Sequence, residues 1–180
     1  MTWCSPSRLC EFPPSKILPY IIDVEEMSEA RILSVEELLK LNLVIPSYQR
    51  PYKWTEKNIR ELILDIQKGI KDANKYPNFK YRVGTVILYQ ENDTKPYEIV
   101  DGQQRILSFL LLKLCLNPSF TCSLLSAMFS DKVTLDNLHS NSDRIREWCS
   151  SVDDGVKEAF DKALSDVLEV VVLTVGELSE

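Results

Sequence analysis

The chain has 180 residues, of which 44% are hydrophobic and 27% are charged, and its formal net charge at pH 7 is −6. This length suffices for one domain with its own core, and the composition excludes collagen, coiled coil and disorder. The acidic balance argues against a general nucleic-acid coat protein, and the single histidine argues against a multi-histidine metal site.

The sequence predicts neither a membrane span nor a secretory signal. Its longest apolar run, Ile106–Leu112, is well short of the roughly 20 residues that cross a bilayer. The first residues lack an apolar signal segment, and the five cysteines form no CxxC pair. We therefore expect a cytoplasmic protein with reduced thiols, and redox chemistry at Cys115 or Cys122 is the alternative.

The first part of the chain is predicted to be irregular. Four prolines within the first 19 residues exclude a long helix, and Ile17–Val24 could form a short strand or an extended arm. Ser34 and Glu37 have the spacing of a capping box, which predicts a helix over 34–41. Leu43–Pro46 then reads as a short strand that is ended by its proline.

An aromatic, basic loop over Tyr48–Trp54 is followed by a predicted helix that Thr55 can cap. Its apolar residues recur at helical spacing and form one core-facing stripe: Ile59, Leu62, Ile63, Ile66 and Ile70. Residues 50–82 carry nine lysines and arginines against four acids, whereas 131–180 carry five against twelve. The basic stretch is either a solvated helix face or a surface for a phosphate-bearing ligand.

The second half of the sequence predicts a β-hairpin, several helices and a last strand. Strands at 82–90 and 96–100 flank a turn, and an apolar helix follows over 106–116. Residues 119–165 contain amphipathic segments, with Asp143–Cys149 and Val156–Leu168 the clearest. The β-branched run Val167–Val175 predicts a buried strand.

The segment Asp101–Arg105 carries the clearest chemistry, because it joins the hairpin to the most apolar helix. A helix N-terminus offers free N–H groups and a positive dipole end, and Gly102 permits close approach of a ligand. Gln103 and Gln104 supply amide groups, and the Arg105 guanidinium suits phosphate oxygens. This pattern predicts an anion site. The alternatives are that Asp101 is only the helix cap and that Arg105 forms a surface ion pair.

Gln49 and Arg50 form a second polar pair, surrounded by Tyr48, Tyr52 and Trp54. Such a loop can stack a base or clamp a phosphate. The alternative is a loop that its aromatic residues pin to the core.

Several segments together resemble a known family. They are Ile45–Trp54, the helix with Leu62 and Asp65-Ile66, Val83–Ile87 and Tyr97–Leu107. In order and spacing they resemble the N-terminal domain of GmrSD-type restriction endonucleases, of the ParB/sulfiredoxin-like superfamily, over about residues 34–116. The resemblance implies an α+β fold in which a small mixed sheet packs against helices and a helical region follows. It divides the chain into an extension (1–30), a nucleotide-binding domain (31–118) and a mainly helical region that ends in a strand (119–180).

The resemblance also implies an activity, namely binding and hydrolysis of a nucleoside triphosphate (NTP), with Mg²⁺, in defence against phage DNA. Asp101 and Arg105 would be catalytic. Gln49, Arg50, Gly102, Gln103 and Gln104 would bind the nucleotide, which could be GTP, ATP or CTP.

We expect the chain to be truncated, because family members continue with an Asn-x-Arg-Gly-type segment and often an HNH-type nuclease domain. Nuclease activity is therefore expected only from a partner domain or subunit. The alternative function is a DNA-binding or regulatory module without turnover, which would contact DNA through Lys53, Lys57 and Arg60. A third possibility is a structural remnant that binds no ligand.

Overall fold

The computed structural model describes residues 29–127 and 129–176, so the arm proposed at Ile17–Val24 lies outside the described residues. A mixed sheet of five strands runs in the order β1-β5-β3-β4-β2. The strands are β1 (Glu29–Ser34), β2 (Leu43–Val44), β3 (Tyr81–Gln90), β4 (Tyr97–Asp101) and β5 (Leu168–Gly176). Antiparallel and parallel neighbours alternate across it.

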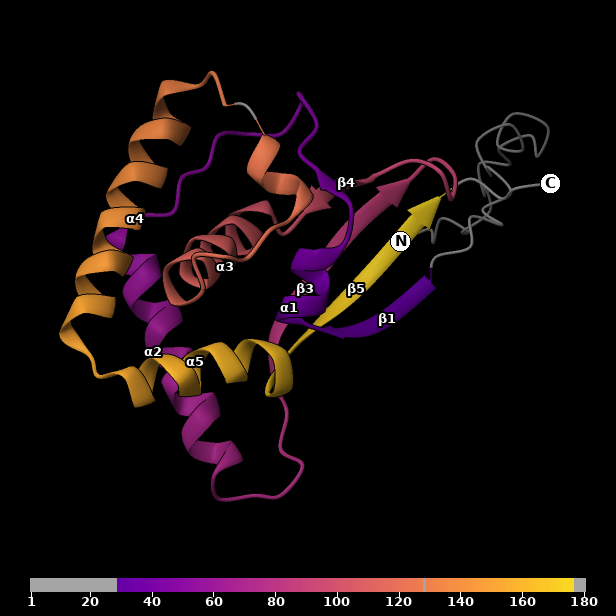
Figure 1. Cartoon of the computed structure of the whole chain (residues 1–180). Helices are drawn as coiled ribbons and strands as arrows, with labels where there is room; N and C mark the ends of the chain where they lie inside the picture. The colour runs from indigo at the N-terminus through magenta and orange to yellow at the C-terminus, as the bar shows by residue number, and fades with distance from the viewer. Residues whose placement is uncertain (1–28, 128, 177–180) are drawn as a thin grey trace, which may run out of the picture.

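Five helices lie to one side of this sheet (Figure 1). They are α1 (Val35–Lys40), α2 (Glu56–Ala73), α3 (Gln103–Leu116), α4 (Lys132–Ser151) and α5 (Asp154–Asp166), with a short 3-10 helix η3 (Ser123–Ser126) between α3 and α4. Among the described residues no helix is long and apolar enough to cross a membrane. The predicted α+β class with a mixed sheet and packed helices is confirmed.

The local predictions agree closely with the observed elements. Ser34 Oγ accepts the N–H of Glu37 at 3.1 Å, and the Glu37 carboxylate accepts the N–H of Ser34 at 2.7 Å, which is the predicted capping box at α1. The predicted hairpin is the antiparallel pair β3–β4. The apolar stripe of α2 is buried at Ile59, Leu62, Ile63 and Ile66.

Strand β5, at the C-terminal end of the described chain, pairs with β1 at its N-terminal end. It pairs antiparallel with β1 and parallel with β3, so it lies inside the sheet. Leu168, Val170 and Val172 are fully buried, and the residues between them are only partly buried. One face of β5 therefore belongs to the core, as its β-branched sequence predicted.

Helix α3 is buried because it is apolar on nearly every side, and it packs against α4, α5 and α1. Its one buried charge is Lys113, whose side chain is 2% exposed. Lys113 Nζ lies 2.7 Å from carboxylate oxygens of both Glu36 on α1 and Asp161 on α5. Burial alone would lower the pKa of Lys113, but its hydrogen bonds to Asp161 and Glu36 outweigh burial and raise that pKa.

Candidate functional site

The junction between β4 and α3 leaves a helix N-terminus without a side-chain cap. Asp101 is the last residue of β4, and Gly102 holds the N-cap position with φ at 94°. Helices α1, α4 and α5 are instead capped by Ser34, Asp131 and Asp153. The first N–H groups of α3 have no acceptor within the helix, so they are available to an anion. The alternative that Asp101 caps this helix is wrong.

Gly102 brings the junction against the neighbouring strand. A Cβ atom at this position would lie 2.8 Å from Val86 Cγ2 on β3, and the positive φ disfavours any other residue. The chain therefore turns from β4 into α3 in direct contact with β3. This turn places the N-terminus of α3 at the edge of the core, where solvent can reach it.

A second glycine positions Arg105. The Arg105 guanidinium lies along β3, where Nη1 donates a long hydrogen bond of 3.4 Å to the carbonyl oxygen of Thr85. A Cβ atom on Gly84 would lie 2.7 Å from Arg105 Nη1, and Gly84 has φ at +125°. Only glycine allows both this backbone and this position of the guanidinium. Among the described residues no carboxylate forms an ion pair with Arg105, so the predicted alternative of a surface ion pair is wrong.

Three glutamines join the loop after β2 to this junction. Gln49 Nε2 donates to the carbonyl oxygens of Ile99 and Val100 on β4, at 2.7 and 2.8 Å. Gln103 Nε2 donates to the Arg50 carbonyl at 3.4 Å. Gln104 forms three hydrogen bonds to backbone groups of the loop. The glutamines that the sequence assigned to nucleotide binding thus hold the loop in place.

Gln104 uses both ends of its amide on the loop. Its Oε1 accepts the N–H groups of Lys53 and Trp54 at 2.7 and 3.1 Å, and its Nε2 donates to the Pro51 carbonyl at 3.2 Å. These bonds satisfy backbone N–H and C=O groups of the loop that have no partner in a helix or sheet. The loop is therefore fixed to the first turn of α3.

Helix α4 holds the same loop from the other side. Tyr52 is fully buried, and its hydroxyl bonds to Ser108 at 2.7 Å and accepts from Asn141 Nδ2 at 3.0 Å. The Tyr52 backbone N–H donates to Thr134 Oγ1, and its carbonyl accepts from Asn137 Nδ2. Burial raises the pKa of the Tyr52 phenol, and the hydrogen bonds of its hydroxyl to Ser108 and Asn141 oppose that rise. The predicted alternative of an aromatic residue pinning the loop is confirmed at Tyr52.

These contacts enclose a cavity of about 210 Å³, which we call the junction cavity. Its lining consists of Gln49, Arg50, Trp54, Val100 and the five residues Asp101–Arg105. Every residue that the sequence assigned to catalysis or nucleotide binding lines it. Arg50 and Asp101 are exposed, and neither forms an ion pair among the described residues. Two cations and a helix N-terminus therefore face one space, which favours an anionic ligand.

The residues proposed for DNA binding lie outside this cavity. Lys53, Lys57 and Arg60 are exposed, and Lys57 approaches only Glu61, at 3.9 Å. Lys80 Nζ, in contrast, donates to the Asp166 carbonyl at 2.6 Å. The exposed lysines and arginines of α2 form a solvated basic face, which is one of the two interpretations of this stretch that the sequence allowed.

Sequence reasoning missed several residues that build the site. Gly84 received no role, although a glycine inside a strand signals a close approach of another group. The hydroxyl of Thr134 and the amides of Asn137 and Asn141 on α4 were also missed. Their signal is weak, because polar residues on an amphipathic helix are ordinarily taken as solvent-facing.

The described residues contain no group of three or more histidine, cysteine or acidic side chains that could hold a metal by themselves. Mg²⁺ in NTP sites is commonly held by one or two carboxylates together with the phosphates. Asp101 supplies one carboxylate at the junction cavity. The residues present therefore fit a metal that arrives with the nucleotide.

The fold and the site define an α+β domain with a cavity at a strand-to-helix junction that two arginines line. The family model of the GmrSD restriction endonuclease N-terminal domain matches residues 34–170 of this chain. The chain therefore belongs to the GmrSD restriction endonuclease N-terminal domain family. The match extends through α4 and α5 into β5, beyond the segments on which the resemblance was based. No curated protein matches the chain.

Proposed function

We propose that this domain binds a nucleoside triphosphate in the junction cavity and hydrolyses it. The observation that carries the proposal is the uncapped N-terminus of α3, which lines one cavity together with Arg50 and Arg105. A triphosphate is the ligand whose charge matches two guanidinium groups and a helix dipole. Membership of a restriction endonuclease family supports a role for this turnover in cleavage of phage DNA.

Each charged group in the cavity has a distinct task in this proposal. The N–H groups at the start of α3 and the Arg50 guanidinium bind phosphate oxygens. Arg105 neutralises the charge that develops on the transferred phosphoryl group. Asp101 orients the attacking water or holds Mg²⁺, which supplies further neutralisation of phosphate charge when bound. The three glutamines act as positioning residues, because their amides hold the loop that carries Arg50.

The test compares Arg105→Ala with Arg146→Ala. Arg146 is an exposed arginine on α4, and its ion pair with Asp143, at 3.3 Å, is also exposed, so it controls for loss of a positive charge. ATP, GTP, CTP and UTP are titrated calorimetrically in Mg²⁺ buffer, and phosphate release is followed in parallel. We expect Arg105→Ala to weaken binding of the preferred nucleotide by about 10- to 100-fold, the value of one or two charge-assisted hydrogen bonds.

The expected control result is that Arg146→Ala binds as the wild type does. If the wild type binds none of the four nucleotides, or if Arg105→Ala binds as tightly as Arg146→Ala, the proposed function is wrong. Binding without phosphate release would remove hydrolysis from the proposal and leave a nucleotide sensor.

A second candidate function is DNA binding without turnover. The supporting observation is that Lys53, Lys57 and Arg60 are exposed beside the loop and along α2. Replacing all three by serine is compared with the same change at Lys68 and Lys71, farther along α2, and at Lys75, just beyond its end, so that total charge is equal. If this surface binds DNA, only the first variant loses affinity, and the salt dependence of binding falls by about one unit per lost phosphate contact.

We further propose that the domain acts in the cytoplasm together with a nuclease domain or subunit that cuts modified DNA. Nucleotide turnover would then control the nuclease. The measurement is cleavage of phage DNA by the domain together with its nuclease partner, with and without the preferred nucleotide.

A further inference from the structure

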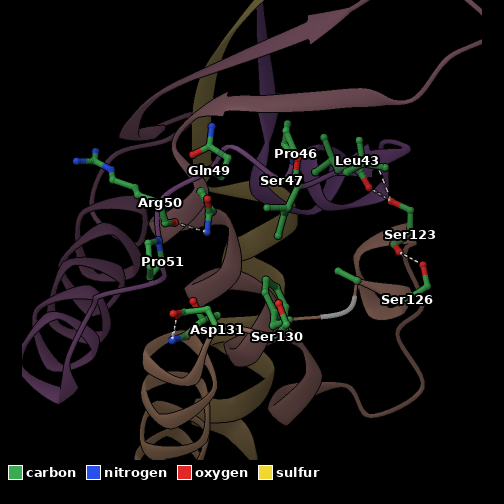
Figure 2. A pocket seen from close by; sticks show the side chains of 16 residues that line it. Leu43, Pro46, Ser47, Gln49, Arg50, Pro51, Ser123, Ser126, Ser130 and Asp131 are labelled. Carbon is green, nitrogen blue, oxygen red and sulfur yellow. Dashed lines mark hydrogen bonds between the residues drawn. The ribbon is translucent and has the colours of Figure 1, made fainter.

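A second and larger cavity opens directly next to the junction cavity. It has a volume of about 490 Å³ and shares Gln49, Arg50 and Gln103 with the smaller one. We call it the hydroxyl cavity, and its lining includes Leu43, Pro46, Ser47, Ser123, Ser130 and Thr134. In Figure 2, Pro46 and Ser47 face Ser130 and Asp131 across the cavity, with Arg50 and Pro51 at one end. The proposed function uses no residue of this space beyond the shared three.

The sizes of the two cavities suit one ligand whose parts occupy both of them. Sites for drug-sized ligands measure roughly 300–1,000 Å³. The junction cavity, at about 210 Å³, falls below this range and can take phosphates but not a whole nucleotide. The hydroxyl cavity, at about 490 Å³, falls within the range and begins where the junction cavity ends. Another cavity, of about 270 Å³, shares Trp54 and Arg105 with the junction cavity, but it falls below the same range. The hydroxyl cavity is therefore the larger of these two neighbouring spaces for the part of the ligand that continues beyond the phosphates.

The lining of the hydroxyl cavity combines apolar surface with hydroxyl groups. Leu43, Pro46 and Pro51 supply apolar contacts for a flat ring. Ser123 Oγ is occupied, because it accepts the Leu43 N–H at 2.8 Å. The hydroxyls of Ser47 and Ser130 form no hydrogen bond to any described residue, and both residues are exposed. A space whose lining is about equally apolar and polar suits a nucleoside, which has a flat base and a sugar with hydroxyls.

Gln103 marks the boundary between the two cavities. The residue is only 6% exposed, and its Nε2 donates to the Arg50 carbonyl. Its Oε1 is buried and has no hydrogen-bond donor among the described residues. A buried acceptor without a partner costs free energy, so a ligand that supplies a donor at this point gains affinity. In a nucleotide the ribose hydroxyls lie between the phosphates and the base.

We propose that the hydroxyl cavity binds the nucleoside part of a ribonucleoside triphosphate, with Gln103 Oε1 accepting a hydrogen bond from a ribose hydroxyl. This inference rests on the proposed function, since the phosphates of the same ligand lie in the junction cavity. It adds that the sugar is recognised and that the base binds between the loop at Pro46–Ser47 and the segment at Ser130–Asp131.

The first experiment separates the two cavities by using tripolyphosphate, which has the phosphates and lacks the nucleoside. Tripolyphosphate and the four ribonucleoside triphosphates are titrated against the wild type, Ser47→Phe and, as a control for an added aromatic ring, Ser150→Phe on α4. In the wild type we expect the preferred nucleotide to bind at least about tenfold more tightly than tripolyphosphate. In Ser47→Phe the ring fills the cavity, so nucleotide affinity falls to within about threefold of that for tripolyphosphate.

Binding of tripolyphosphate itself is expected to be equal in all three proteins, which also shows that Ser47→Phe is folded. If Ser47→Phe does not fold, Ser130→Phe fills the cavity from the opposite wall and replaces it. If neither ligand binds the wild type, the proposed function fails. If both bind and Ser47→Phe leaves nucleotide affinity unchanged, only the nucleoside site is wrong.

The second experiment tests Gln103. The preferred nucleotide is compared with its 2′-deoxy and 3′-deoxy analogues in the wild type and in Gln103→Met, which lacks the acceptor. We expect the wild type to prefer the ribonucleotide over at least one analogue by about tenfold, and Gln103→Met to lose that preference. A purely structural role for Gln103 would weaken all three ligands equally. Equal affinities in the wild type would overturn the contact to ribose.

Discussion

The cations at the two ends of helix α3 differ in whether the protein supplies a carboxylate partner. Near the C-terminal end, Lys113 is buried and lies 2.7 Å from each of two carboxylates, those of Glu36 and Asp161. At the N-terminal end, Arg105 and the neighbouring Arg50 form no ion pair among the described residues. Helix α3 therefore carries one cation, Lys113, that other residues neutralise. At its N-terminus, Arg105 and the free N–H groups remain available to a ligand.

This difference teaches how structural charge and functional charge are told apart. A buried cation must find partners within the protein, because its desolvation is costly. A cation at the mouth of a cavity can remain hydrated and exchange that water for phosphate. Changes at the Lys113 end should thus alter stability, and changes at the Arg105 end should alter binding.

The largest effect on stability is expected for Lys113→Met. This change removes two charge-assisted hydrogen bonds, to Glu36 and Asp161, whose carboxylates are partly exposed, and should cost about 3 kcal/mol. The free energy of unfolding is measured by urea denaturation. Lys157→Met is the control, because Lys157 pairs with an exposed Asp154, and its loss should cost less than about 1 kcal/mol. Equal losses in the two variants would contradict the comparison.

The next effect is expected for Gly84→Ala, which should disturb both stability and binding. The added Cβ atom would lie 2.7 Å from Arg105 Nη1, and φ of +125° strains any residue with a side chain. We expect a loss of about 2 kcal/mol in the free energy of unfolding and weaker binding of tripolyphosphate.

The matched control for that change is Gly155→Ala in α5, where the backbone is helical. The added Cβ atom would lie 3.2 Å from Asp153 Oδ1, the end of a side chain that can shift, and alanine is a better helix former than glycine. This variant should therefore differ from the wild type by less than about 1 kcal/mol. If Gly84→Ala binds tripolyphosphate as the wild type does, Gly84 does not position Arg105.

A smaller loss of stability is expected for Gln104→Ala. The change leaves the N–H groups of Lys53 and Trp54 without their acceptor and should cost about 1 kcal/mol, measured by urea denaturation. The released loop also carries Arg50, so tripolyphosphate binding should weaken. Gln67→Ala, at an exposed position of α2, should change neither quantity. Unaltered binding in Gln104→Ala would show that the loop keeps its position without this amide.

The smallest effect is a dependence of stability on acid pH. The hydrogen bond from Lys113, followed by that from Lys40, lowers the pKa of Glu36 below its ordinary value of 4.5. This group therefore stabilises the fold above pH 4.5, and its contribution is lost as the pH falls below 4.5 through the lowered pKa. Urea denaturation between pH 6 and pH 3 should show this decline in the wild type and a shallower one in Lys113→Met. Parallel declines would contradict the role of Lys113.

The sequence by itself determined the local elements and predicted the chemistry of the main motif. The capping box at Ser34, the apolar stripe of α2 and the hairpin could be predicted because each depends on residues close together in the chain. The polar run Asp101–Arg105 before an apolar helix likewise indicated an anion site. Family membership followed from the same short segments.

The cap was the point at which this local reasoning failed. Asp101 has a common capping side chain, but the chain continues as strand β4 through that residue and turns only at Gly102. The turn requires glycine at this position, because φ is positive and β3 lies too close for a Cβ atom there. That contact comes from pairing between strands, which the five-residue motif does not contain.

Tertiary structure alone decided what the glutamines do and where the loop lies. Gln49 and Gln104 donate to or accept from backbone groups about 50 residues away, and Asn141 reaches the loop from almost 90 residues away. Sequence patterns report which face of an element is apolar, since that depends on near neighbours. They do not report which loop a polar side chain meets, because that partner is set only when the sheet and the helices have packed.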